Sequence, residues 1–293
     1  MCSSDLSYCL IDDTLYRRTK NGPRIVVRKS QRPFLLQLLH DHLGHYDSES
    51  TYLMVKDRAW WPSLYRDVRN YVRSCESCQK RQPMGTGFGS KGLQAPVSGL
   101  FFTIAIDAAG PLPLTPRGNK YMLVAVEHLT GWPIAMALPK VSATEVTDFI
   151  EHLIVRPYTT PRRIMSDNGT PFTAAHTRQY AKRRGIAWSY TAAYNPQGNG
   201  RVERMIRTLK NSMAKIIHDK ITDWDRALPA ALHGYRVRPT RERPSPYELL
   251  FGTQPDILPQ DAQIIPQVIS SDYRPLEIAQ VNAAREERRH GEG

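Results

Sequence analysis

The spacing of apolar residues changes along the chain and divides it into parts of different character. Between positions 6 and 30, short apolar runs separated by turn residues predict a small β element. From Trp61 to Cys75, apolar side chains recur every three or four positions, which predicts an amphipathic helix that starts at Pro62. Positions 83–97 hold four glycines and two prolines, a composition typical of a linker between domains.

After the linker, apolar runs alternate with stretches of helical spacing, which predicts an α/β unit. Turn residues separate the first three runs, so we expect the first three strands to form an antiparallel meander. A capping sequence at 142–145 starts the first helix. We expect strands at 101–109, 121–127, 132–138, 162–166 and 186–190, and helices from 142 and at 172–184, 201–218 and 223–235.

The long helix expected at 201–218 has one apolar side and one charged side. Glu203, Arg207 and Lys210 fall on the charged side, one turn apart. Residues 201–243 carry eleven Lys or Arg and five Asp or Glu. An ordinary solvated face has this character too, but Glu203, a candidate catalytic acid, lies one turn from these bases, and we therefore favour contact with a DNA phosphate backbone. The apolar side predicts contact with the core and consists of Val202, Ile206, Leu209, Met213 and Ile216.

The overall composition indicates a polyanionic partner. The 293 residues carry 40 Lys or Arg and 28 Asp or Glu, a net charge of +12. Basic residues that neutralise phosphates release counterions, so nucleic acid suits this charge, although a solvated basic surface has it as well. No uninterrupted apolar run approaches the roughly 20 residues that a membrane span needs. The N-terminus lacks the pattern of a signal peptide, and we expect no membrane partner.

A group of cysteine and histidine residues predicts a zinc site. Cys75 and Cys78 are separated by two residues, and four cysteines in all are too few for a disulfide framework. Zinc binds four soft or borderline ligands, and two imidazoles would complete the set. They come from His45 and from either His40 or His42; we favour His40 because four residues then separate the histidines. Reduced buried thiols with surface histidines are the alternative.

Three acidic residues stand where strands end and a helix begins. Asp107 lies near the end of a strongly apolar strand, Asp167 ends a short strand, and Glu203 lies in the first turn of the long helix. Each has an ordinary explanation by itself, as a paired charge, a turn cap or a helix N-terminal acid. Together they suit attack on a phosphodiester, which two divalent ions about 4 Å apart promote through oxygen ligands.

Residues 6–252 resemble the integrases of retroviruses and, more closely, of gypsy-like long-terminal-repeat retrotransposons. Asp107, Asp167 and Glu203, with 35 residues between the last two, are similar to the family's Asp, Asp-35-Glu signature. The paired histidines and cysteines resemble its His-His-Cys-Cys domain. The flanking sequences that carry the likeness are Trp60-Trp61-Pro62, Ser166-Asp167-Asn168-Gly169, Asn195-Pro196-Gln197-Gly198-Asn199-Gly200 and Ser245-Pro246-Tyr247-Glu248-Leu249-Leu250-Phe251-Gly252.

The resemblance implies a fold, a reaction and partners. The fold is α/β, a ribonuclease-H-like core with a five-stranded mixed sheet and flanking helices, preceded by a small helical zinc-binding domain and a short N-terminal β element. The reaction is DNA 3′-end processing and strand transfer on double-stranded DNA by a homo-oligomer, a tetramer, in the nucleus. The implied residues are His40, His45, Cys75 and Cys78 for Zn²⁺, Asp107, Asp167 and Glu203 for Mg²⁺ or Mn²⁺, and Asn168, Gln197, Arg204, Arg207 and Lys210 for DNA.

The expected segments leave one alternative function open. The C-terminal tail is short and polar, whereas relatives usually carry a small β-barrel there, so a catalytically silent, integrase-derived DNA-binding or assembly protein is the alternative. A plain ribonuclease-H-type nuclease is weaker because it leaves the zinc unit unexplained. The segments are an N-terminal β extension (1–32), the zinc-binding domain (33–82), a linker (83–97), the catalytic core (98–252) and a partly disordered tail (253–293).

Overall fold

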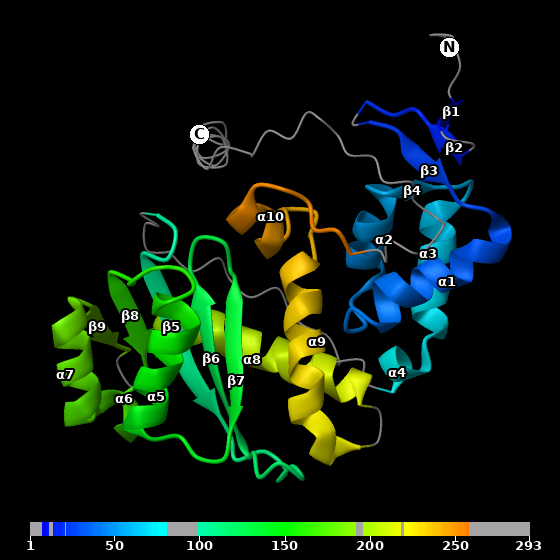
Figure 1. The fold of residues 1–293 in the computed structure, drawn as a ribbon. Coiled ribbons are helices and arrows are strands. Elements are labelled where there is room, and N and C mark those ends of the chain that lie inside the picture. The colour runs from blue at the N-terminus through cyan, green and yellow to red at the C-terminus, as the bar shows by residue number, and fades with distance from the viewer. Residues whose placement is uncertain are drawn as a thin grey trace. The chain divides into compact units, whose positions relative to one another are not determined.

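Two compact units make up the structure, which is a computed structural model (Figure 1). One unit comprises residues 1–80 and 237–293, and the other comprises residues 81–236. No helix in the part of the chain that the structure describes is long and apolar enough to cross a membrane. The expected linker at 83–97 and most of the tail lie outside the described residues. The described residues are 8–11, 14–20, 22–80, 99–191, 196–217 and 220–257.

The first unit begins with a small sheet, which confirms the expected N-terminal β element. Strands β1 (Tyr8–Ile11) and β2 (Thr14–Arg17) form an antiparallel hairpin, and β3 (Arg24–Val26) pairs antiparallel with β2. The fourth strand, β4 (Ala59–Trp60), comes from a later part of the chain and runs parallel to β3. The N-terminal β element therefore belongs to the same folded unit as the residues expected to bind zinc.

Short helices surround the core of this unit. Leu35, Met54 and Trp61 are among its nearly inaccessible side chains. The helix expected from Pro62 begins two residues later, because Ser63 has a left-handed backbone with φ of 68°. The helices are α1 (Arg32–Leu36), which continues as a π-helical turn (Gln37–Asp41), α2 (Ser48–Lys56), α3 (Leu64–Ser74) and α4 (Glu76–Gln79).

The described residues 237–257 belong to this first unit. Val237 is buried in its core, and the Arg238 guanidinium lies 4.5 Å from the centre of the Tyr46 ring. Helix α10 (Pro246–Phe251) belongs to this segment. The sequence places the end of the catalytic core at 252, whereas the compact unit that contains the large sheet ends just before Val237.

A five-stranded mixed sheet forms the centre of the second unit and confirms the expected fold class. Its strand order is β7-β6-β5-β8-β9. The first three strands in the chain pair antiparallel, as their turn residues predict, and β8 and β9 add in parallel beyond β5. The strands are β5 (Thr103–Ala109), β6 (Tyr121–Glu127), β7 (Pro133–Leu138), β8 (Arg163–Ser166) and β9 (Ala187–Tyr190).

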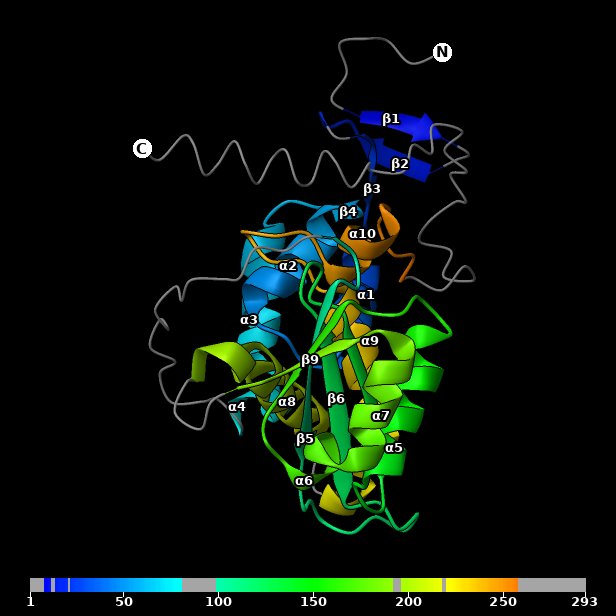
Figure 2. The ribbon, with the colours of Figure 1, turned by 90° about the vertical axis from the view of Figure 1, so that its left-hand side faces the viewer.

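Helices cover both faces of this sheet (Figure 2). In β5, Ala105 and Ala109 pack in one cluster with residues of α8 and α9. Ile104 and Ile106 alternate with them and face the other side, where α5 and α7 lie (Figure 2). The helices are α5 (Ala143–Ile150), which continues as a π-helical turn (Glu151–Val155), α6 (Thr170–Thr173), α7 (Ala175–Arg184), α8 (Pro196–Ile216) and α9 (Trp224–Val237).

Two helices differ from the prediction. The helix expected at 172–184 is divided into α6 and α7 at Ala174, whose backbone is extended. The long helix α8 begins earlier than expected, at Pro196, because proline fits the first turn of a helix. On its apolar side Met205 is buried, whereas Ile206 is only partly buried against the same cluster. The apolar side still faces the core, as its spacing predicts.

Candidate metal centres

Two histidines and two cysteines of the first unit gather around one point. The metal-binding atoms of His40, His45, Cys75 and Cys78 all lie within 4.8 Å of one another. Cys75 Sγ is 3.3 Å from His45 Nδ1, and Cys78 Sγ is 3.4 Å from His40 Nε2. Zinc–nitrogen bonds of about 2.0 Å and zinc–sulfur bonds of about 2.3 Å give a tetrahedron whose N–S edge is about 3.5 Å. The four side chains therefore fit a zinc ion.

Local geometry decides which of the upstream histidines joins this group. His40 lies in the π-helical turn and is fully buried, whereas His42 is exposed. Thr51 Oγ1 lies 3.4 Å from His40 Nδ1, which leaves the Nε2 atom to face Cys78. His45 follows the π-helical turn, which ends at Asp41, and has a left-handed backbone with φ of 56°. The structure thus brings together His40 and His45 and leaves His42 in solvent.

Three carboxylates converge on the face of the large sheet that α8 covers. Asp107 shares one face of β5 with Ala105 and Ala109, which pack in the cluster that contains α8. Glu203 lies on α8. Asp167 directly follows β8, which is the parallel neighbour of β5. Two adjacent strands and one helix therefore direct the three acids to a shared region.

The charges of these acids act on one another. The pKa of Asp107 is raised to about 6, first by burial and then by the charges of Asp167 and Glu203, while Lys210 acts in the opposite direction. A divalent cation would relieve this repulsion. Among the described residues, the zinc ligands are the only group of three or more whose ligand atoms lie within 4.8 Å of one another, and the three acids do not form a second such group.

Each aspartate has one oxygen engaged by a neighbouring backbone N–H. Asp107 Oδ1 accepts a 2.7 Å hydrogen bond from Ala108, and Asp167 Oδ1 accepts a 3.0 Å bond from Gly169. A Cβ atom at Gly169 would lie 3.0 Å from that same oxygen, so glycine permits the close approach. Asp167 therefore does cap its turn, and a second oxygen of each carboxylate remains available for a metal ion.

Basic side chains follow Glu203 along α8. Arg204, Arg207 and Lys210 are exposed, as is Glu203. Lys210 is close enough to Asp107 to lower its pKa. This exposed basic side has the position and charge to receive a phosphate backbone next to the three acids.

The other two residues expected to contact DNA are Asn168 and Gln197. The Asn168 amide donates a 3.3 Å hydrogen bond to the Thr191 carbonyl and so ties the end of β8 to the end of β9. Asn168 is exposed, but part of its hydrogen-bonding capacity serves the loop. Gln197 belongs to α8, and its side chain lies outside the described part of the chain.

The sequence does not single out Arg201, which supports the site. Its guanidinium donates a hydrogen bond to the carbonyl of His128, at the turn after β6. This contact holds α8 to the sheet two residues before Glu203. Burial lowers the pKa of His128 to about 4, and the Arg201 charge acts in the same direction, so this imidazole is neutral at pH 7. No local pattern predicts the pair, because 73 positions separate its members.

A fourth acid, Glu127, lies at the end of β6 but has a structural role. It is fully buried. Its two carboxylate oxygens accept backbone hydrogen bonds of 2.8 Å from Leu129 and 2.6 Å from Thr130. The carboxylate therefore caps the turn between β6 and β7, and it is not available as a metal ligand.

Two regions of this chain match models of known protein families. The family model of the integrase zinc binding domain matches residues 27–84, and that of the integrase core domain matches residues 104–196. The Gag-Pol polyprotein of avian reticuloendotheliosis virus is 34% identical over 248 residues, which are 81% of this chain and 20% of the polyprotein. The chain belongs to the integrases of retroviruses and retrotransposons.

Two further proteins are similar to this integrase over different shares of its length. The Pro-Pol polyprotein of simian foamy virus type 3 (strain LK3) is 31% identical over 238 residues, which are 79% of the integrase chain and 20% of that polyprotein. The crystal structure of the catalytic core domain of BIV integrase is 32% identical, with a TM-score of 0.42, and the match covers 51% of this chain and 93% of that one. The integrase chain spans about a fifth of the length of these curated polyproteins.

The family matches agree with the resemblance that the sequence motifs indicate. The zinc-domain match contains all four gathered His and Cys ligands. The core match contains Asp107 and Asp167 and ends before Glu203. The integrase therefore has a zinc-binding domain and a ribonuclease-H-like core, as expected, and a gypsy-like type remains a prediction.

Proposed function

We propose that this integrase is a metal-dependent polynucleotidyl transferase that trims DNA 3′ ends and joins them to target DNA. One observation carries the proposal: Asp107 on β5, Asp167 after the paired strand β8 and Glu203 on α8 lie near one another, and the charges of the last two raise the pKa of Asp107. The match to the integrase core supports the reaction class. The gypsy-like type is part of the same proposal and rests on the motifs at 166–169 and 245–252.

The three carboxylates would hold Mg²⁺ or Mn²⁺. When bound, such ions stabilise charge on the entering and leaving oxygens of the phosphodiester and lower the pKa of the attacking hydroxyl. Hard ions of this kind take oxygen ligands and keep several waters. Asp107 and Asp167 each retain one oxygen without a backbone hydrogen bond, and Glu203 is exposed on α8. This donor set suits magnesium better than a soft metal.

The basic side of α8 would bind the DNA backbone. Arg204, Arg207 and Lys210 are exposed on the helix that carries Glu203. A phosphate bound by Lys210 would lie beside Asp107, whose pKa that lysine already lowers. Contacts of this kind position DNA but carry no sequence information.

The family also suggests how and where the protein works. We propose a homo-oligomer, a tetramer on two DNA ends, in the nucleus. Light scattering of the zinc-loaded protein with and without paired DNA ends measures the assembly. A monomer under both conditions would contradict it, and a tagged protein excluded from nuclei would contradict the location.

A strand-transfer assay tests the proposed reaction. Purified, zinc-loaded protein should join labelled DNA ends to a plasmid in Mg²⁺ or Mn²⁺. Asp167→Asn should abolish joining and leave zinc content unchanged. Asp148→Asn, at an exposed acid on α5, is a matched control that should remain active. Joining by Asp167→Asn would contradict the assignment. DNA binding by the unmodified protein, with no joining or nicking in either metal, would favour the DNA-binding or assembly alternative.

A further inference from the structure

A shallow groove on the first unit combines basic and aromatic side chains. Its volume is about 540 Å³, and none of its described lining residues is acidic. The proposed catalytic machinery uses none of these residues. The lining residues that matter here are the basic Arg17, Arg24, Lys56 and Arg66 and the aromatic Trp60 and Tyr65.

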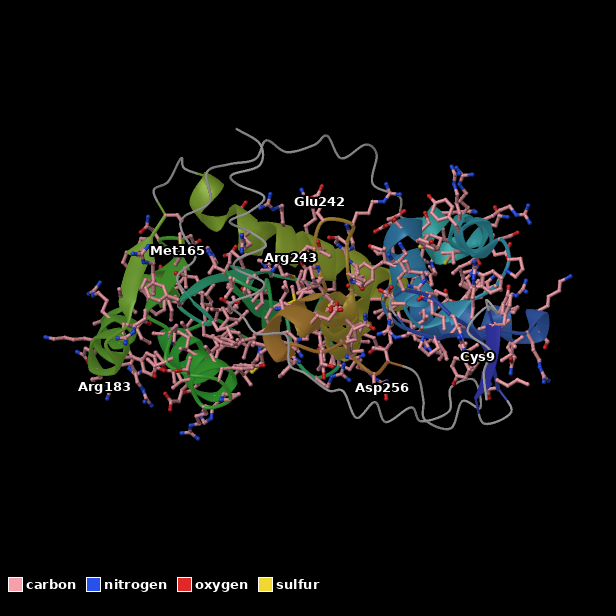
Figure 3. The ribbon with its side chains drawn as sticks, turned by 90° about the horizontal axis from the view of Figure 1, so that it is seen from above. Cys9, Met165, Arg183, Glu242, Arg243 and Asp256 are labelled. Carbon is pink, nitrogen blue, oxygen red and sulfur yellow. The ribbon has the colours of Figure 1, made fainter. Side chains whose placement is uncertain are left out.

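Two parts of the chain build this groove together. Arg17 lies on β2 and Arg24 on β3, near the β1 strand that Cys9 marks in Figure 3. Lys56 ends α2 and Arg66 lies on α3, between the zinc ligands in the sequence. The parallel pairing of β3 with β4 joins the two parts. The groove therefore needs both the N-terminal β element and the zinc-binding helices.

Most of the positive charge in the groove has no acidic partner. Arg24 forms one ion pair, at 3.9 Å. Within the described residues, Arg17, Lys56 and Arg66 form none. Arg17 lies instead with its guanidinium 4.1 Å from the centre of the Trp60 ring. Clustered cations repel one another, and a polyanion relieves this repulsion while it releases counterions.

Aromatic rings in the same groove offer surfaces for unpaired bases. The Tyr65 side chain is 44% exposed. Its ring contacts the ring of Tyr52 edge-on, with centroids 5.1 Å apart, so its orientation is held. A nucleic-acid base stacks on such a ring whatever its sequence. A surface that recognises phosphates alone does not need an exposed, oriented tyrosine among its cations.

We propose that this groove binds a single-stranded segment of DNA, with its phosphates on Arg17, Lys56 and Arg66 and a base stacked on Tyr65. The inference deepens the proposed function and rests on it for the choice of DNA as the polyanion. Duplex DNA contacts the basic side chains, but its paired bases are not free to stack on the tyrosine. Unpaired nucleotides at a processed or frayed DNA end have the required chemistry.

Fluorescence anisotropy with the full, zinc-loaded chain tests this groove. The chain carries Asp167→Asn, so that binding is measured without catalysis, and the probes are labelled oligo(dT) and a blunt duplex of the same length. Tyr65→Ala should weaken oligo(dT) binding about 5-fold or more and leave duplex binding unchanged. Phe34→Ala removes another aromatic side chain, 49% exposed and outside the groove, and should change neither. Equal effects of the two substitutions on oligo(dT) would overturn the stacking role.

A second pair of variants tests the basic side chains. Lys56→Ala combined with Arg66→Ala should weaken both probes and reduce the slope of log K against log salt by about 1–2. Arg69→Ala, exposed on α3 outside the groove, should have a smaller effect. If polyglutamate displaces oligo(dT) as well as unlabelled DNA does, the groove takes an acidic peptide and the proposal fails. A failure here leaves the strand-transfer result intact, because the assay needs no catalysis.

Discussion

The Tyr71 hydroxyl donates a 2.9 Å hydrogen bond to Asp41 Oδ2, next to the zinc ligands. The other carboxylate oxygen, Oδ1, is buried and accepts no hydrogen bond within the described residues. It lies 4.0 Å from His40 Nε2 and 3.9 Å from His45 Nδ1, the two nitrogens that face the cysteines. The Asp41 charge is therefore placed to stabilise a bound Zn²⁺ without being one of its four ligands.

Tyr71→Phe should weaken zinc binding. Burial, followed by the bond to Asp41, raises the pKa of Tyr71 well above its usual range, so the phenol remains a donor at neutral pH. Without it the carboxylate loses its anchor, and we expect about a 10-fold loss of zinc affinity. Competition with a colorimetric chelator measures this. Tyr52→Phe removes a hydroxyl that forms no hydrogen bond within the described residues and is the control. Equal affinity in the two variants would contradict the role of Asp41.

His40→Ala and His42→Ala form a matched pair that tests the ligand set. The two histidines are separated by one residue, but only His40 lies with His45 and the cysteines. His40→Ala should lose bound zinc and lower the thermal midpoint of the chain, because binding free energy of the metal contributes to folding of so small a unit. His42→Ala should retain one zinc per chain. Metal analysis and circular dichroism measure both, and zinc retained by His40→Ala would refute the assignment.

Arg207→Ala and Lys210→Ala should each weaken duplex DNA binding and reduce its salt dependence. A side chain that neutralises one phosphate contributes about 1 to the slope of log K against log salt. The control is Arg183→Ala, an exposed arginine on α7, which lies on the opposite face of the sheet from α8 (Figures 2 and 3). Titrations at several salt concentrations measure the slopes. Slopes that match those of Arg183→Ala would show that α8 does not face the DNA backbone.

The spacing of neighbouring residues predicts those elements whose sequence pattern lies within one segment of the chain. The meander of β5, β6 and β7 follows from alternating apolar runs and their turns, and the zinc ligands follow from residue type and spacing. The neighbourhood of Asp107 and Asp167 does not follow in this way. It depends on the parallel pairing of β5 with β8, which joins Thr103 to Arg163, and the sequence indicates it only through the acids at strand ends taken together and through the family resemblance.

The features that the sequence pattern does not predict are contacts between segments that are far apart in the chain. No periodicity indicates that β4 completes the N-terminal sheet or that Val237 is buried in the core of the first unit. The hydrogen bond from Arg201 to His128 is of the same kind. In each case the partners are chosen by packing in three dimensions, and a pattern read along one segment carries no information about them.

The buried Asp225 carboxylate makes the second unit sensitive to acid. Burial alone would raise its pKa, but hydrogen bonds from Arg117, Asn119 and Thr115 outweigh burial and lower the pKa from 3.8 to about 2. Asn119 Nδ2 and Thr115 Oγ1 lie 2.8 and 3.0 Å from Asp225 Oδ2. Because the folded pKa is the lower one, this carboxylate stabilises the fold above its ordinary pKa, and the contribution is lost as the pH falls towards 2.

Asp225→Asn should therefore destabilise the protein at pH 7 by about 1–2 kcal/mol, since charge-assisted hydrogen bonds to a buried group are lost. The difference from the unmodified chain should shrink as the pH falls below about 4, where the native carboxylate begins to take up a proton. Asp148→Asn, at an exposed acid on α5, should show no such dependence. Denaturation followed by circular dichroism across this pH range measures all three proteins. A difference that stays constant down to the lowest pH would mean that the charge of Asp225 does not stabilise the fold.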